Sequence, residues 1–268
     1  MKKSKLYSKI IKTSKIMKII ILFFLFLNQF YFSKILYNYF NNINNIKACF
    51  CTLGKNENKY IREFVQHYEA YGVDKIFLYD NNDIDGERFE IVINEYQQKG
   101  FIDILNWRGK KEQIYNIMND CYKQNYKNYN WLIFYEIDEF IHLNNYSNIK
   151  NFLSEYKFKS CPLIYLNLVC HTDNNNLYYE NKSLFERFPS IVPDTKFGGQ
   201  RLEVKFILKG HIPNIIIKNI HICNDNIPNC NGFGHKNKII DIYTTEIDNK
   251  NYYIDHFYSK STEEFINL

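Results

Sequence analysis

Negative charge is missing from one end of this 268-residue chain, because residues 1–46 contain eight lysines and no aspartate or glutamate. Subtracting those eight from the 34 lysines and arginines leaves 26 basic groups against all 29 acidic groups, so residues 47–268 carry a net charge of −3. A nucleic-acid-binding protein concentrates its positive charge on the folded domain. The charge distribution of this chain therefore argues against that class of function.

Proline is also scarce: there are five, and all of them lie after residue 160. The stretch from residue 46 to residue 140 thus has no proline to interrupt a helix or a strand. The sequences G-x-G-x-x-G and G-x-x-x-x-G-K-[ST] are absent, so dinucleotide-binding and P-loop interpretations have no support. With 46% hydrophobic and 18% aromatic residues, the chain is nevertheless too apolar to be disordered, and residues 47–268 suffice for one large domain.

A long apolar run, IIILFFLFLNQFYF, occupies residues 19–32 between Lys18 and Lys34. The 15 residues between these lysines make about 22 Å of helix, less than the roughly 30 Å of a bilayer's hydrocarbon core. Flanking lysines can snorkel, and no small-x-small cleavage site follows. We therefore favour a signal anchor over a cleaved signal peptide or a helix lying in the membrane interface. Seven lysines precede the run, which predicts a cytosolic N-terminus.

The predicted organisation is a cytosolic basic tail (1–18), a signal-anchor transmembrane helix (19–34), a stem (35–46) and a lumenal body (47–268) in the Golgi or the endoplasmic reticulum. Cysteines can pair in such an oxidising compartment. There are seven, an odd number, and their spacings match no zinc ribbon. Cys49 and Cys51 are expected on one strand. Most of the cysteines are expected to be buried thiols, with Cys223–Cys230 the favoured bridge. Glycosylation sequons at Asn145 and Asn181 are consistent with this location.

Strand and helix patterns alternate from residue 46 to residue 140. Apolar runs predict strands at 46–53, 75–79, 101–105 and 131–135, and apolar residues at helical spacing predict helices around 61–68, 89–96 and 113–126. This rhythm is typical of a doubly wound α/β domain, whose ligands bind at the carboxyl ends of the parallel strands.

The pattern changes after residue 160, where prolines and glycines separate shorter strands. These are expected at 163–169, 202–208, 215–217 and 220–223 and predict a mixed, partly antiparallel region that completes the sheet. Residues 189–199 are expected to form a mobile loop.

The acids in Glu136-Ile137-Asp138-Glu139-Phe140 directly follow the fourth predicted strand. In an extended chain, Glu136 and Asp138 would point to the same side. Two such carboxylates repel each other unless a cation lies between them, and their hard oxygens suit Mn²⁺ or Mg²⁺. Taken alone, the pair favours a simpler alternative, in which the acids cap the next element.

Other short motifs follow one another in order along the chain. They are Lys55-Asn56-Glu57, Tyr60-Ile61 with Glu63, His67, Gly72-Val73, Leu78-Tyr79-Asp80-Asn81 with Asp85, Gln113, Asp120-Cys121, Trp131, Asp138-Glu139-Phe140, Glu186-Arg187-Phe188, Val204-Lys205, and His256-Phe257-Tyr258-Ser259-Lys260-Ser261 with Glu263-Glu264-Phe265. Together they resemble glycosyltransferase family 92 and the related family-2-like transferases of the GT-A fold, over residues 47–268.

This resemblance implies a GT-A (Rossmann-like) α/β fold, with a mixed sheet flanked by helices and an N-terminal membrane anchor helix. It also implies a hexosyltransferase that uses a nucleotide sugar, with a UDP-sugar as the expected donor and a glycan or glycoconjugate as the acceptor. The expected outcome is inversion with the help of Mn²⁺ or Mg²⁺.

By position, the resemblance makes Asp138 the last acid of the family's D-x-D motif and an expected metal ligand. Glu136 stands at the first acid, where the family usually has aspartate, which leaves donor choice and activity open. His256 resembles the family's C-terminal histidine and is expected to complete the metal site. Its alternative role is packing among neighbouring aromatic residues.

Donor contacts are expected from residues at or near the strand ends and from two later lysines: Thr52, Glu57, Asp80, Gln113, Lys205 and Lys260. For two of them a structural role is the alternative, because Glu57 can cap the following helix and Lys260 can be a surface lysine at a helix start. An inverting transferase needs a base for the acceptor hydroxyl. The candidates are Asp173, Glu186 and Asp194, with Asp194 favoured because its loop is able to close over substrate.

Two other functions compete with this one. The first is a catalytically inactive carbohydrate-binding or scaffolding protein of the same fold, suggested by Glu136 and by the missing tryptophan and Phe-Gly motifs around residues 167–170. The second is a metal-dependent hydrolase or nucleotidyltransferase, since acid pairs serve those enzymes too.

Overall fold

The computed structural model describes residues 33–34, 45–111, 114–172, 182–191, 202–223, 227–237, 239–240, 242–244, 248 and 250–258. The chain divides into two compact units, Met1–Asn45 and Ile46–Leu268. Within the described ranges, no helix is both long enough and apolar enough to cross a bilayer. Of the predicted signal anchor, only Ser33 and Lys34 are described, so the anchor stays a prediction.

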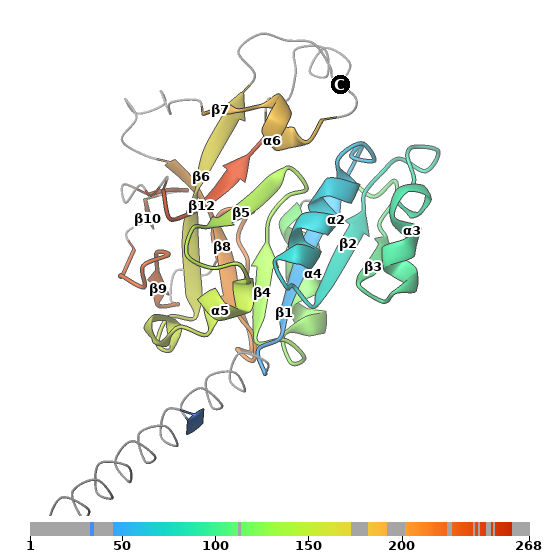
Figure 1. Cartoon of the computed structure of the whole chain (residues 1–268). Coiled ribbons are helices and arrows are strands. Elements are labelled where there is room, and N and C mark those ends of the chain that lie inside the picture. The colour runs from blue at the N-terminus through green and yellow to red at the C-terminus, as the bar shows by residue number, and fades with distance from the viewer. Residues whose placement is uncertain are drawn as a thin grey trace, which may run out of the picture. The chain divides into compact units, whose positions relative to one another are not determined.

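The first half of the body alternates strand and helix as its apolar pattern predicts. It contains β1 (Ala48–Gly54), α2 (Ile61–Ala70), β2 (Lys75–Asp80), α3 (Glu90–Gln98), β3 (Ile102–Asn106), α4 (Ile114–Asn125) and β4 (Trp131–Phe134). The four strands pair in parallel in the order β3-β2-β1-β4 (Figure 1). The predicted crossover units are thereby confirmed.

The second half extends this sheet in mixed directions. It contains β5 (Glu139–Leu143), α5 (Ile149–Leu153), the 3₁₀ helix η1 (Tyr156–Phe158), β6 (Leu163–Thr172), α6 (Leu184–Arg187), β7 (Ser190–Ile191), β8 (Leu202–Lys209), β9 (Asn229–Cys230), β10 (Ile239–Ile240), β11 (Tyr243–Thr244) and β12 (Tyr252–His256). The sheet continues past β4 in the order β8-β6-β12-β5. β8 is antiparallel to β4 and β6, whereas β12 is parallel to β6 and antiparallel to β5.

The predicted mixed α/β sheet flanked by helices is therefore confirmed, with differences in detail. Strands β5 and β12 escaped prediction because each is short and lies next to charged residues. The expected strands at 215–217 and 220–223 shrink to a single bridge between Ile217 and Cys223. Of the expected loop 189–199, the structure describes residues 189–191, and β7 lies there.

Strand alternation divides the core between the two faces of the sheet. On β1, Phe50 joins the cluster that contains the buried face of α2, while Cys49 and Cys51 join the cluster that contains α4. The predicted apolar face of α2 is buried in full, from Ile61 to Tyr68. The central strands therefore have an apolar layer on each side, and the buried polar groups Asn167 on β6 and Lys205 on β8 interrupt these layers.

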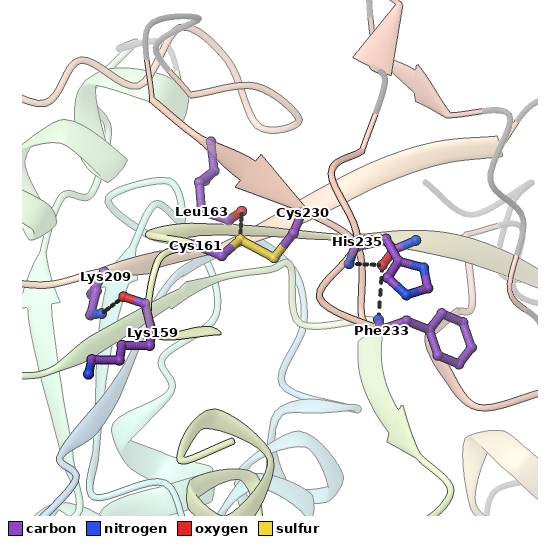
Figure 2. The surroundings of a disulfide bond; sticks show 8 residues. Lys159, Cys161, Leu163, Lys209, Cys230, Phe233 and His235 are labelled. Carbon is purple, nitrogen blue, oxygen red and sulfur yellow. Dashed lines mark hydrogen bonds between the residues drawn. A yellow bond between two sulfur atoms is a disulfide. The ribbon is translucent and has the colours of Figure 1, made fainter. Parts of the chain in front are cut away.

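Two disulfides tie distant segments together. Cys51–Cys121 joins β1 to α4, and Cys161–Cys230 joins the start of β6 to β9 (Figure 2). The expected Cys223–Cys230 bridge is wrong, because β9 lies beside the start of β6 and so brings Cys230 to Cys161. The expectation that most cysteines are buried thiols is wrong as well, since four of them are paired. The placement of Cys49 and Cys51 on one strand is confirmed.

Candidate functional site

The candidate site lies at the edge of the sheet where the parallel strands end. Strand β1 lies between β2 and β4 in the sheet. The chain continues from β1 to β2 and β3 on one side, whereas β4 lies on the other side, so the strand order switches between β1 and β4. β8 runs antiparallel to β4, so it begins at this edge, and β12 ends here, where His256 pairs with Glu139 at the start of β5. Three separate segments, the turn from β4 to β5, β8 and β12, therefore bring Glu136, Glu139, Lys205 and His256 to one place.

The acidic motif turns instead of continuing the strand. β4 ends at Phe134, the Glu139 backbone amide donates to the Glu136 carbonyl at 3.2 Å, and the Glu136 amide donates to Glu139 Oε2 at 2.9 Å. The expectation that Glu136 and Asp138 share one side of an extended chain is therefore wrong. The turn sends Glu136 toward Lys205 and Asp138 toward His256.

Lys205 is fully buried between two carboxylates. Its Nζ lies 2.5 Å from Glu136 Oε2 and 2.9 Å from Glu139 Oε1. Burial alone would lower the pKa of Lys205, but the two carboxylates outweigh burial and raise it. Burial would likewise raise the pKa of Glu136, but Lys205 prevails and holds it below its ordinary value. For Glu139, burial dominates and raises the pKa to about 8. Lys205 thus serves as the internal counter-ion of Glu136 and lies beside the fully buried Glu139.

Asp138 and His256 face each other beside this ion-pair cluster. His256 Nε2 lies 3.9 Å from Asp138 Oδ1 and 3.8 Å from Glu139 Oε1. Burial lowers the pKa of His256, which favours a neutral imidazole with a lone pair available to a metal. Two ligand atoms that each lie about 2.1 Å from one cation are at most about 4.2 Å apart, so this pair fits a shared cation. The described residues contain no group of three or more His, Cys, Asp or Glu side chains that could hold a metal ion.

The predicted donor-binding residues are placed at several points along the strand ends. Thr52 is buried on β1, and the Glu57 carbonyl accepts hydrogen bonds from the Tyr60 and Ile61 amides at the start of α2. Lys205 already has Glu136 and Glu139 as its ion-pair partners. Its contact with a diphosphate therefore stays a prediction. Gln113 and Lys260 lie outside the described residues.

Asp80 is already engaged at the end of β2. Its Oδ2 lies 2.7 Å from Arg108 Nη1, and its Oδ1 accepts hydrogen bonds from the backbone amide and the side chain of Asn82. Arg108 also donates to four backbone carbonyls of the turn that follows β2: those of Asp83, Ile84, Gly86 and Glu87. This pair shapes the turn, and the ribose contact expected of Asp80 stays a prediction. The sequence analysis did not single out Arg108. Its position just after the third predicted strand could have indicated that it lies at the same edge of the sheet as Asp80.

Glu186 forms a helix cap at the position where a base was expected. Its carboxylate accepts hydrogen bonds from the Ser183 amide and hydroxyl, each at 3.0 Å, and completes a capping box on α6. These bonds lower the pKa of Glu186, which makes it a weaker base. The other two candidate bases, Asp173 and Asp194, lie outside the described residues.

A second buried pair, His171 and Asp255, joins the ends of β6 and β12. His171 Nε2 lies 2.7 Å from Asp255 Oδ1, and His171 Nδ1 lies 2.9 Å from the Phe188 carbonyl. Burial lowers the pKa of His171, but Asp255 outweighs burial, and the net shift is upward. No motif in the sequence signalled this pair, which depends on the register of two distant strands.

Comparison with known proteins places this arrangement in a family. Residues 44–265 match the family model of glycosyltransferase family 92. The chain belongs to glycosyltransferase family 92. Its similarity to a family 92 protein of Oryza sativa subsp. japonica is 29% identity over 126 residues, which is 46% of this chain and 21% of that protein. A family 92 protein of Arabidopsis thaliana is 27% identical over 95 residues, 35% of this chain and 16% of that protein. The matches thus span only about a fifth of the length of these family 92 relatives.

Solved structures show a weaker similarity to this family 92 chain. TarS of S. aureus in complex with UDP has a TM-score of 0.37 at 13% identity and covers 50% of this chain and 38% of its own. GalNAc-T7 with UDP, GalNAc and Mn²⁺ has a TM-score of 0.36 at 11% identity and covers 61% and 35%. The mannosyltransferase PcManGT from Pyrobaculum calidifontis, in complex with GDP-Man and Mn²⁺, has a TM-score of 0.35 at 6% identity and covers 50% and 43%.

Proposed function

We propose that this family 92 chain is a metal-dependent hexosyltransferase. It would move a sugar from a nucleotide-sugar donor, with a UDP-sugar as the first candidate, to a glycan or glycoconjugate acceptor, with inversion at the transferred carbon. The supporting observation is the Asp138–His256 pair, whose Oδ1 and Nε2 atoms face each other at 3.9 Å where the parallel strands end.

Asp138 and His256 are the residues that would hold Mn²⁺ or Mg²⁺. When bound, such an ion acts as a Lewis acid that stabilises the negative charge on a departing nucleoside diphosphate. The carboxylate of Asp138 and the neutral imidazole of His256 provide the donor atoms, and Lys205 keeps the neighbouring carboxylates paired. Glu136 would then support the site through Lys205, and direct metal contact by Glu136 is the second possibility within this proposal.

Acceptor activation and donor contacts are the remaining parts of the proposal. Asp194 is the proposed base, because its loop is able to close over substrate, whereas the Glu186 carboxylate caps α6. The proposed donor contacts are those predicted from the sequence: Thr52, Glu57, Asp80, Gln113, Lys205 and Lys260.

We also propose that the body lies in the lumen of the Golgi or the endoplasmic reticulum, anchored by one pass through residues 19–34. The lysine-rich, acid-free residues 1–46 support this orientation. Two disulfides between distant segments support an oxidising compartment. Protease protection of the body in intact microsomes, lost on adding detergent, is the expected result, and digestion without detergent would contradict the proposal.

The activity is tested with the full chain, a panel of nucleotide sugars, glycan acceptors and Mn²⁺. Release of nucleoside diphosphate is expected, and the variants Asp138→Asn and His256→Ala should each lower the rate about a hundredfold or more. Both variants should also weaken Mn²⁺ binding measured by calorimetry. Glu90→Gln is the matched control, since it alters an exposed carboxylate at the start of α3. Full turnover by Asp138→Asn would overturn the metal role.

One observation favours a second candidate function, a carbohydrate-binding or scaffolding protein without turnover. Glu136, at the position of the family's first acid, lies 2.5 Å from Lys205. Stabilisation by UDP and Mn²⁺ without turnover of any donor would favour this candidate. Release of free sugar without an acceptor would instead indicate a hydrolase.

A further inference from the structure

A cavity of about 120 Å³ lies against β6, between this strand and the segment that runs from β9 to β12. Its described lining is mostly polar or aromatic and includes Asn167, Phe233, Asn237, Thr244, Asp248 and Tyr252. A water molecule occupies about 30 Å³ of liquid, so the cavity exceeds the space of a single water. It is also well below the roughly 300 Å³ at which drug-sized sites begin, which limits a ligand to one small ring or less.

Asn167 supplies an unmet hydrogen-bond donor in this lining. The residue is 3% exposed, and its Oδ1 accepts a hydrogen bond from the Asp248 backbone amide at 3.0 Å. That bond fixes the orientation of the amide group, and Nδ2 has no hydrogen-bond partner among the described residues. A buried donor without a partner costs about 1–3 kcal/mol, which an oxygen atom of a ligand or a water would recover.

The charge of the lining selects the ligand class. Among the described lining residues, Asp248 carries the only charge, and lysine and arginine are absent. The Asp248 carboxylate accepts hydrogen bonds from the amides of Lys250, Asn251 and Tyr252, which holds it in place as a negative group. Anions such as phosphate and sulfate are therefore disfavoured, and a neutral ligand with hydroxyl oxygens is favoured.

Phe233 adds an apolar surface to these polar groups. Its side chain is 40% exposed, and its ring lies at an edge-to-face angle to Tyr252, with centroids 5.0 Å apart. Phe233 lies in the turn that directly follows Cys230, which is bonded to Cys161 (Figure 2). The Phe233 backbone amide donates a hydrogen bond to Asn231 Oδ1. Gly232 permits the close approach, since a Cβ there would lie 2.4 Å from Tyr252 Cβ. The ring is thus pre-organised next to the amide groups.

We propose that this cavity is a binding site for one neutral sugar residue of a glycan, separate from the candidate catalytic edge. A sugar ring combines hydroxyl groups, which suit Asn167, with an apolar C–H face, which suits Phe233. Along the paired strands β6 and β12, Asn167 stands opposite Tyr253, three residues before His256. Three residues correspond to about 10 Å along the strand, which separates Asn167 from the candidate catalytic edge.

The test uses NMR binding to the full chain with free D-glucose, D-galactose, D-mannose and N-acetyl-D-glucosamine as probes. At least one of these sugars should bind with millimolar affinity. Asn167→Asp keeps the acceptor for the Asp248 amide but replaces the donor with an oxygen, and Phe233→Ala removes the exposed ring. Each variant should weaken binding roughly tenfold. Ile91→Ala is the control, because it shortens a 79% exposed apolar side chain on α3 and should change nothing.

Three results would overturn the proposal. The first is that none of the four sugars binds the folded chain, which would leave the cavity to water. The second is binding that Asn167→Asp and Phe233→Ala leave unchanged. The third is binding that Asp138→Ala abolishes, which would place the sugar at the catalytic edge. Because Asn167 stands about 10 Å from His256 along the paired strands, Asn167→Asp should leave the Mn²⁺ affinity unchanged, so failure here is distinguishable from failure of the proposed transferase.

Discussion

Glu136 and the fully buried Lys205 form an ion pair of 2.5 Å that joins the turn after β4 to β8. The two residues are 69 positions apart in the sequence. Lys205 also lies 2.9 Å from Glu139, so one ammonium group serves two carboxylates. This arrangement holds together the turn that carries Asp138, and it decides which acid of the motif stays available at the edge of the sheet.

Replacing Lys205 should destabilise the fold strongly. Lys205→Met leaves the Glu136 carboxylate without its counter-ion and removes the ammonium group beside the fully buried Glu139, so we expect a loss of about 3–5 kcal/mol in the free energy of unfolding. The exposed pair of Lys55 and Asp83 is the control, since Lys55→Met should cost at most about 1 kcal/mol. Urea denaturation measures both. Equal losses in the two variants would show that Lys205 contributes no more to the free energy of unfolding than an exposed lysine does.

Replacing Arg108 should loosen the turn after β2. Arg108→Lys keeps the charge but loses the forked donors that reach Asp80 and four carbonyl groups, so we expect a loss of about 2–4 kcal/mol. Hydrogen exchange of the backbone amides in the turn should be faster in this variant. Arg88→Lys, at an exposed position nearby, should stay within about 0.5 kcal/mol. A small effect at Arg108 would mean that the turn is held by other contacts.

The stability of the protein should depend on pH through His171. The pKa of His171 is raised above 6.5 in the folded state, chiefly by Asp255 acting against burial. Its contribution is therefore fully present below about pH 6.5 and is lost as pH rises through the folded-state value. Urea denaturation of the wild type and of His171→Gln across this window should show a smaller decline in the variant. His235→Gln, at an exposed position, should behave like the wild type. Parallel curves for the wild type and His171→Gln would exclude this linkage.

Peptide mapping without reduction should find the Cys51–Cys121 and Cys161–Cys230 bridges, and alkylation after unfolding should label Cys49, Cys170 and Cys223. Removing the second bridge by Cys161→Ala with Cys230→Ala should cost roughly 2–5 kcal/mol, because the bridge spans 69 residues. Detection of a peptide joined through Cys223 and Cys230 would contradict the structure.

Local sequence patterns predicted the elements of the first half well. The spacing of Ile61, Phe64, Val65 and Tyr68 predicted α2 because one apolar face of a helix repeats every three or four residues. The alternation of strands and helices then placed the acidic motif at the end of a strand, because crossover connections make successive strands parallel. The same argument located the candidate site at that edge of the sheet.

Local patterns did not predict the partners across the sheet, since these depend on strand order and register, and the pairing of Asp138 with His256 was expected only from the family resemblance. The extended-chain argument for Glu136 and Asp138 failed because a turn separates them, and nothing local predicted that Lys205 would bind the first of them. The Cys223–Cys230 prediction failed for a similar reason, because nearness in sequence is a weak guide once β9 pairs with β6.

The sequence by itself determined the parallel α/β first half, the strand-end position of Asp138 and the acid-free lysine-rich N-terminal segment, because helical and strand periodicities and charge counts are local properties. Only the tertiary structure decided that Asp138 and His256 come within 3.9 Å of each other, that Lys205 lies between Glu136 and Glu139, and that Asn167 lines a cavity against β6. These relationships arise where strands distant in sequence become neighbours, and the pairing of such strands is set by the packing of the whole sheet.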